Sequence, residues 1–357
     1  EAPVCFFDIE TTGLSPAISN VYLIGAAVIS DDAVILTQWF ADDYDSEKKL
    51  LMAFADELMS SKTVIHYNGS TFDIPYLEKK YIAHELPSPF INTESFDIYR
   101  RLSSKKQLFN TPDHKLTTME RLAGFNRGFD YSGRECIDIY SEYMQSKFAH
   151  EDDRASDSRK RLLSHNSDDV VGTIYCLALM PYIKHIRGSH ELRFTKNAAV
   201  FKDILPDGLY YPFPLDTEIT ISDHMKQKRS TENIPGEAFE HEYTMTVSYR
   251  DNYVLVNVPL IDDTLYHFFP DHKNYYYLPD EDMAIHKSVG EFVDKAHRRQ
   301  ASASDCYIKK SGLFMPLPKN APIPGNALVY KYKHAPKGVS YIEAHSASAE
   351  DMISFVL

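Results

Sequence analysis

The stretch C-F-F-D-I-E-T-T-G-L, residues Cys5–Leu14, is the segment around which we expect this protein to fold. Its apolar start predicts a buried strand. Asp8 and Glu10 stand two positions apart, so in an extended chain their side chains project from the same face. Adjacent carboxylates are costly to bury unpaired, and a hard divalent cation removes that cost. The alternative is an ordinary strand with two solvated acids, which a bare D-x-E pattern favours when it stands alone.

The length of the chain indicates the number of domains, and its net charge limits the ways in which it could bind nucleic acid. A chain of 357 residues with 43% hydrophobic residues predicts two domains with sizeable cores. The formal net charge of −13 argues against a protein that coats nucleic acid by bulk electrostatics. It leaves open an enzyme that binds a strand end through metal ions. The excess acid lies mainly in residues 1–185, whose net charge is −9, against −4 for the remainder.

The compartment is indicated by the cysteines and by the absence of membrane signals. No apolar run in the sequence is long enough to cross a bilayer, and its start shows no secretory leader. The four cysteines are widely spaced and form no C-x-x-C pair: Cys5, Cys136, Cys176 and Cys306. This usage predicts buried thiols in a reducing compartment, with neither a disulfide framework nor a zinc site. We therefore expect a cytoplasmic protein that does not enter membranes.

The apolar pattern of residues 1–188 predicts an α/β domain. Three early strands with short links, Val4–Asp8, Val21–Ile29 and Val34–Phe40, indicate an antiparallel meander. Further strands are predicted at Thr63–His66 and Phe96–Ile98. Helical spacing is found at Ser46–Ser60, Phe72–His84, Leu116–Ala123, Ile137–Phe148 and Arg161–His185, and Gly124–Gly133 reads as a loop. The order of these elements predicts a mixed sheet flanked by helices.

The apolar pattern of residues 189–357 differs from that of residues 1–188 and predicts a hairpin-rich α+β accessory domain. Hairpins are predicted within Glu242–Val258, His267–Leu278, Cys306–Leu317 and Leu328–Ala344, and an amphipathic helix over Asp280–Gln300. Tyrosines with interleaved basic residues are typical of surfaces on which a single strand stacks. Tyrosine is also simply favoured in strands. The accessory domain is thus open to three interpretations: strand binding, ordinary sheet packing, or binding of a protein partner.

A second informative stretch is I-H-Y-N-G-S-T-F-D-I-P-Y-L, residues Ile65–Leu77. A short strand ends in an Asn-Gly turn, and Asp73 then opens a helix that has Pro75 in its first turn, where proline is well tolerated. A lone aspartate at this place favours helix capping. The alternative is that Asp73 directs a third carboxylate toward the acids of the first strand.

The third stretch is L-S-H-N-S-D-D-V-V-G-T-I-Y, residues Leu163–Tyr175, within a long predicted helix. His165 and Asp169 are four apart, so they share one helix face. This spacing suits a pair in which one residue positions a water and the other holds a metal. A surface His–Asp pair explains the stretch equally well when it is taken alone.

Taken in order, the patterns D-x-E, N-x-x-x-F-D and H-x-x-x-D resemble those of the DEDD superfamily of 3′–5′ exonucleases, which have a ribonuclease-H-like fold. The segment Y-N-G-S-T-F-D-I-P-Y-L is similar to the proofreading domain of family B DNA polymerases and to YprB-type exonucleases. The resemblance covers about residues 3–185. It implies two-metal hydrolysis at the 3′ end of a single-stranded nucleic acid, DNA or RNA, with Mg²⁺ or Mn²⁺ as the two divalent cations.

The resemblance also assigns roles to individual residues. The metal-binding carboxylates would be Asp8, Glu10, Asp73 and Asp169. The contacts to the terminal nucleotide would be Thr11, Thr12, Gly13, Leu14 and Asn68. Relatives with tyrosine in the third motif use Y-x-x-x-D and those with histidine use H-x-x-x-x-D, whereas this chain combines His165 with the shorter spacing. An imidazole accepts a proton near neutral pH better than a phenol does, so we expect His165 to be the general base. The alternative function is a catalytically weak nucleic-acid-binding or scaffolding protein.

Overall fold

The computed structural model describes residues 4–29, 33–184, 188–223, 241–319, 321–335 and 337–354. Its internal contacts divide the chain into two compact units. The first comprises Glu1–Lys106 and Thr111–Ile183, and the second Gln107–Asn110 and Lys184–Leu357. Among the described residues, no helix combines the length and the apolar character needed to cross a membrane.

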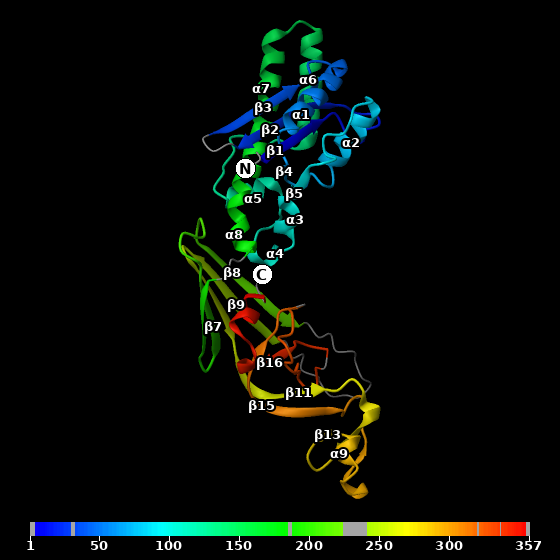
Figure 1. Cartoon of the computed structure of the whole chain (residues 1–357), viewed down its shortest axis with the longest axis vertical. Coiled ribbons are helices and arrows are strands. Elements are labelled where there is room, and N and C mark those ends of the chain that lie inside the picture. Colours follow the sequence, from blue (N-terminus) through cyan, green and yellow to red (C-terminus); the bar gives the residue numbers. More distant parts are fainter. Residues whose placement is uncertain are drawn as a thin grey trace, which may run out of the picture. The chain divides into compact units, whose positions relative to one another are not determined.

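The first unit is built on a five-stranded mixed sheet in the order β3-β2-β1-β4-β5 (Figure 1). The central strand β1 (Val4–Thr11) pairs antiparallel with β2 (Val21–Ile29), and β2 pairs antiparallel with β3 (Val34–Phe40). On its other side β1 pairs parallel with β4 (Thr63–His66), which pairs parallel with β5 (Glu94–Asp97). The predicted meander and the predicted mixed sheet are both confirmed.

Helices connect and cover these strands. They are α1 (Glu47–Leu58), α2 (Asp73–Ala83), α3 (Ile98–Ser103), α5 (Leu116–Leu122), α6 (Gly133–Phe148), α7 (Asp152–Cys176) and α8 (Met180–Ile183). Helix α7 begins earlier than the predicted Arg161, because Asp152 and Asp153 favour a helix N-terminus. It also ends at Cys176, and His185 lies outside the described residues.

Successive side chains of β1 point to opposite faces of the sheet, and the two faces contact different groups. Phe7 points into the apolar core, where its ring lies 5.5 Å from that of Phe54 on α1. Asp8, the next residue, points to the opposite face, where Asn166 of α7 donates a hydrogen bond to its carboxylate. Strand β1 therefore packs against α1 with one face and presents its acids to α7 with the other.

The second unit consists mainly of antiparallel sheets. The first contains β6 (Ser189–Phe194), β7 (Ala198–Ile204), β10 (Tyr253–Pro259), β9 (His241–Arg250) and β8 (Leu215–Asp223), in that order. The second contains β11 (Ile261–Phe268), β15 (Tyr307–Pro316) and β16 (Tyr341–Glu343). The third contains β13 (Met283–His286), β12 (Tyr275–Leu278) and β14 (Arg299–Gln300). Short helices accompany them: α4 (Lys106–Phe109), α9 (Lys287–Gly290) and α10 (Ala349–Ser354).

The predicted hairpins of this unit are confirmed in part. Strands β9 and β10 form the hairpin predicted within Glu242–Val258, and Tyr330 bridges Tyr341 as the last hairpin requires, although Pro336 in its turn lies outside the described residues. The hairpin His267–Leu278 is wrong, because β11 pairs with β15 instead of β12. The hairpin Cys306–Leu317 is also wrong, because β15 runs unbroken through that segment.

The helix predicted over Asp280–Gln300 is wrong as well. The segment contains β13, the four-residue helix α9 and β14. Strand β12 has partners on both sides, β13 and β14, and these cross-strand hydrogen bonds override the helical spacing of the apolar residues. Several tyrosines of this unit are core residues, since Tyr249, Tyr307, Tyr330 and Tyr341 are all buried.

Candidate metal centre

Three carboxylates from two elements meet on the α7 side of the sheet. Asp8 and Glu10 come from β1, and Asp169 comes from α7. Each offers an oxygen, and these oxygens all lie within 4.8 Å of one another. The strand places the first two on one face and the helix brings the third across it, as the D-x-E pattern and the helical third motif require.

The electrostatics of this cluster favour a bound cation. Burial raises the pKa of both Asp8 and Glu10 well above the usual range, and the charges of Asp169 and Asp73 raise them further. A hydrogen bond from Tyr22 to Glu10 offsets only part of this effect. Carboxylate oxygens are the donors that Mg²⁺ and Mn²⁺ prefer, so the residues present fit such ions.

Asp73 lies beside this cluster at the start of α2. It is the first residue of the helix, with Phe72 at the capping position, so it is not the helix cap that a lone aspartate would suggest. Burial raises the pKa of Asp73 to about 7, although backbone N–H groups of Asp73 and Ile9 donate hydrogen bonds to its carboxylate. Its charge acts on both acids of β1. Asp73 is not in the group of acids whose oxygens lie within 4.8 Å of one another, so its part in metal binding remains a prediction.

His165 faces two of these acids. Its Nε2 lies 3.1 Å from Oδ2 of Asp169 and 3.4 Å from Oε1 of Glu10, and its side chain is only 7% exposed. Its other ring nitrogen, Nδ1, is buried and has no hydrogen-bond partner among the described residues. A surface His–Asp pair is thus excluded, and the ring belongs to the acidic centre.

Sequence reasoning missed a buried arginine at the centre. Arg127 lies in the loop predicted at Gly124–Gly133, and its side chain is 4% exposed. Its Nη1 lies 2.8 Å from Oδ1 of Asp169, while Nε and Nη2 donate to the two oxygens of Glu120 at 2.6 Å each. These carboxylates raise the pKa of Arg127, so a permanent positive charge adjoins one of the candidate metal ligands. A single arginine in a loop carries no spacing signal that could have revealed this contact.

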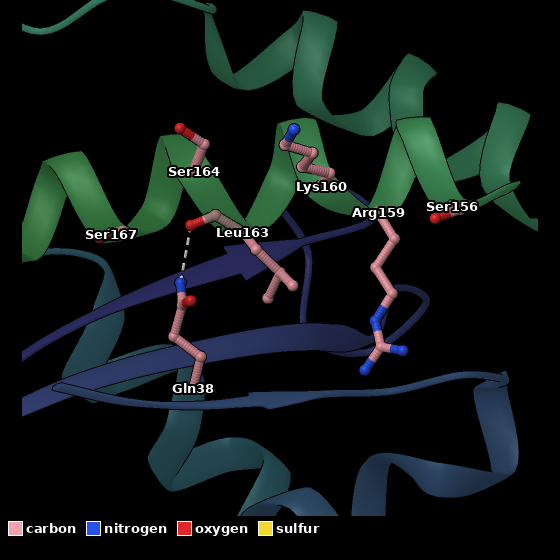
Figure 2. Close-up of a pocket in the computed structure, with 7 residues that line it drawn as sticks. All are labelled: Gln38, Ser156, Arg159, Lys160, Leu163, Ser164 and Ser167. Atoms are coloured by element: carbon pink, nitrogen blue, oxygen red, sulfur yellow. Dashed lines mark hydrogen bonds between the residues drawn. The ribbon is translucent and has the colours of Figure 1, made fainter. Parts of the chain in front are cut away.

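Asn166 is the second residue that sequence reasoning missed. It is fully buried, and its Nδ2 donates to Oδ2 of Asp8 at 3.1 Å. Its Oδ1 accepts a hydrogen bond of 2.9 Å from Nε2 of Gln38 on β3. Figure 2 shows Gln38 reaching toward α7, where it also donates to the carbonyl of Leu163 at 2.8 Å. Asn166 follows His165 directly in the third motif, so the sequence indicated that it lies near the site. The sequence did not indicate that it contacts Asp8.

Gln38 also borders an open groove next to α7. The other residues that line it are Ser156, Arg159, Lys160, Leu163, Ser164 and Ser167 (Figure 2). The acids of the candidate metal centre are not among them. The groove is therefore a separate surface feature, which the hydrogen bonds of Gln38 and Asn166 connect to Asp8.

The predicted nucleotide contacts occupy two turns. Thr11 Oγ1 donates to the carbonyl of Gly13, and Thr12 Oγ1 accepts from the backbone N–H of Asn20, so the turn is pinned while Leu14 remains 83% exposed. In the other turn Asn68 has a φ of 61°, and its N–H donates to Asp97, which is thereby a structural residue. Contact of these turns with a strand remains a prediction.

The fold agrees with the family comparison. Residues 5–180 match the RNase_H_2 family model, described as RNase H superfamily. This part of the chain, which makes up nearly all of the first unit, is similar to that superfamily. Among curated protein sequences, none matches the chain.

Solved structures of E. coli exonuclease I are similar to the chain. The zinc-bound form with single-stranded DNA has a TM-score of 0.33 at 17% identity, covering 51% of this chain and 40% of that chain. Exonuclease I with a dT13 oligonucleotide has the same TM-score and identity, covering 51% and 42%. The SSB/exonuclease I structure with the inhibitor CFAM has a TM-score of 0.34 at 13% identity, covering 58% and 57%. The chain thus spans roughly half the length of these proteins.

Proposed function

We propose that this protein is a metal-dependent 3′→5′ exonuclease that hydrolyses phosphodiester bonds of single-stranded nucleic acid. One observation carries the proposal: Asp8, Glu10 and Asp169 bring carboxylate oxygens within 4.8 Å of one another, on an RNase H superfamily domain. Asp73 and His165 border the same cluster. Carboxylates gathered and buried in this way repel a phosphodiester unless cations are bound among them.

In the proposed mechanism Asp8, Glu10, Asp73 and Asp169 would hold two divalent cations, Mg²⁺ or Mn²⁺. When bound, such ions activate a water and stabilise the leaving 3′-oxygen of an in-line displacement. The protein's own part is to keep the carboxylates in place. Asn166 orients Asp8 by donating to its Oδ2, and Arg127 holds Asp169 through its guanidinium.

His165 takes the proton of the attacking water in this proposal. A general base must lie within hydrogen-bond reach of that water, and the ring already adjoins two of the carboxylates that would hold the ions. Replacement of His165 by alanine is expected to lower turnover roughly 10²–10⁴-fold while sparing metal affinity. Unchanged turnover would remove His165 from the mechanism.

The strand end would be held by the two turns beside the acids. Leu14 exposes an apolar side chain that suits packing against the terminal base, on a backbone pinned through Thr11 and Thr12. Asn68 lies in the turn that precedes α2 and Asp73. These features support an exonuclease that recognises a free terminus, and they leave the choice between DNA and RNA open.

The decisive experiment uses oligonucleotides labelled at the 3′ or the 5′ end, incubated with Mg²⁺ or Mn²⁺ and then with EDTA. We expect immediate release of labelled mononucleotide from the 3′ label, a ladder of shortened products from the 5′ label, and no product in EDTA. Asp8→Ala should abolish the reaction. Asp157→Ala is the matched control, because Asp157 is an exposed acid of α7, and it should leave the rate unchanged.

The alternative, a catalytically weak binding or scaffolding protein, gives a different result. The wild-type protein would then be inert with either metal and would still retard the oligonucleotide in a gel. Product release that is equal in EDTA and in Mg²⁺ would contradict both interpretations, because neither contains a metal-independent reaction.

A further inference from the structure

A buried cysteine adjoins the candidate metal centre from the side of α6. Cys136 is fully buried, and its Sγ, a carboxylate oxygen of Glu10 and a ring nitrogen of His165 all lie within 4.8 Å of one another. The three residues come from three different elements, α6, β1 and α7. The fold therefore brings together one sulfur, one nitrogen and one oxygen donor. No C-x-x-C or H-x-x-x-H pattern in the sequence predicts this set of donors.

This donor set differs in chemistry from the set of acids beside it. Mg²⁺ takes oxygen ligands, whereas thiolate and imidazole are the ligands that Zn²⁺ prefers. In a tetrahedral zinc site a sulfur and a nitrogen ligand are about 3.5 Å apart, so the observed spacing needs only small side-chain adjustments. His165 also has an unsatisfied coordination capacity, because Nδ1 is buried without a hydrogen-bond partner among the described residues and the side chain is only 7% exposed.

The buried cysteine of α7, Cys176, shows that burial alone does not create this arrangement. Cys176 is also a free and fully buried thiol in the first unit, yet it belongs to no such group of donors among the described residues. Cys136 is distinguished by its neighbours, a carboxylate and an imidazole, rather than by its burial. A cysteine that only filled space would gain nothing from these two polar partners.

We propose that Cys136, His165 and Glu10 form a Zn²⁺ site that overlaps the candidate hydrolytic centre, so that bound Zn²⁺ inhibits hydrolysis. On binding, the thiol loses its proton to solvent and the thiolate becomes a ligand. The same event withdraws Glu10 from the Mg²⁺ ligands and His165 from its role as base. The inhibition rests on the proposed exonuclease function, whereas the zinc site itself does not.

The zinc site is tested first without any activity assay, by titrating the full chain with Co²⁺ as a spectroscopic substitute for Zn²⁺. We expect a thiolate-to-cobalt charge-transfer band in the near ultraviolet that Zn²⁺ abolishes by displacement. The band should be absent from Cys136→Ser and present in Cys176→Ser, which removes an equally buried thiol outside the site. Zn²⁺ affinity, measured by competition with a chromogenic chelator, should fall at least about 10-fold in Cys136→Ser only.

Two results would overturn the site. One is the absence of the charge-transfer band from the wild-type protein. This result does not depend on whether any variant folds. The other is a band that survives in a folded Cys136→Ser protein, as checked by circular dichroism. Hydrolysis is a separate readout: Zn²⁺ added to the Mg²⁺ reaction should inhibit the wild type and Cys176→Ser at concentrations at which Cys136→Ser remains active. A confirmed band together with an inert protein would refute the exonuclease and keep the zinc site.

Discussion

At the scale of single residues, the centre is a balance between buried negative charges and the groups that hold them. Asp8, Glu10 and Asp169 meet there, and the guanidinium of Arg127 contacts both Asp169 and the neighbouring Glu120. Asn166 adds a neutral donor to Asp8. These partners orient the carboxylates without neutralising the whole cluster, so charge remains for metal ions to compensate.

The first residue-scale prediction concerns Asn166. In Asn166→Ala, Asp8 loses the amide that orients it and Gln38 loses an acceptor. We expect Mg²⁺ affinity, measured by isothermal titration calorimetry, to fall about 10–100-fold, as is typical when a partner of a metal ligand is removed. Asn126→Ala, at an exposed asparagine of the same unit, should bind Mg²⁺ normally. Equal affinities in a folded Asn166→Ala protein would show that the hydrogen bond has no role in binding.

The second concerns the pH dependence of stability without metal. The pKa of Asp73 is raised from 3.8 to about 7 in the folded protein, so the folded state retains a proton that the unfolded chain releases at lower pH. Stability from this group is therefore lost as the pH rises from about 4 to about 7. In EDTA, Asp73→Asn should melt with the wild type at about pH 4 and at least about 2 °C above it at pH 8. In Mg²⁺ the order should reverse at pH 8, because only the wild type keeps the metal ligand; a constant difference across pH would contradict the assignment.

At the scale of secondary structure, the site depends on how closely α7 approaches β2 and α5. Glycines permit that approach at two places. A Cβ on Gly25 of β2 would lie 2.1 Å from Oδ1 of Asn166, and one on Gly172 of α7 would lie 2.0 Å from Oε2 of Glu120. Both side chains are buried and hydrogen-bonded, so they have little freedom to move.

Gly172→Ala tests this packing. Helix propensity alone would favour alanine by about 1 kcal/mol. The clash with Glu120, which Arg127 holds through two hydrogen bonds, should outweigh it and destabilise the protein by about 1–3 kcal/mol in urea unfolding. Gly133→Ala, at the open start of α6, meets no atom within 4 Å and should be neutral or stabilising. A stabilised Gly172→Ala protein would mean that Glu120 can shift freely.

At the scale of the whole molecule, the two units differ in what they contribute. All acids of the centre lie in the first unit, together with Arg127, Asn166 and Cys136. In the second unit, basic side chains stack on its own tyrosines, with Arg298 4.5 Å from the ring centre of Tyr276 and Arg299 4.4 Å from that of Tyr277. Strand binding or protein binding by this unit remains a prediction.

Hydrogen exchange distinguishes these contributions. Mg²⁺ should slow exchange in β1 and α7, which supply the ligands, and should leave the sheets of the second unit unchanged, because a ligand stabilises the part of the structure that binds it. Adding a non-hydrolysable oligonucleotide should extend protection to β9–β10 or β15 only if the second unit binds the strand. Asp8→Asn is the control and should show no response to Mg²⁺. Equal protection of both units by Mg²⁺ alone would contradict a centre confined to the first.

The sequence by itself determined the five strands and most of the helices of the first unit, and it singled out Asp8, Glu10 and Asp169, whose oxygens the structure brings together. Alternation along Val4–Thr11 and helical spacing along α7 are local properties, and each places its acids on a defined face. Local pattern failed at Asp280–Gln300, where cross-strand partners outweighed helical spacing. Only the tertiary structure decided that Arg127 contacts Asp169, that Asn166 contacts Asp8 and that Cys136 adjoins His165. Such contacts depend on how elements pack, and no spacing along the chain records the distance between two residues on different elements.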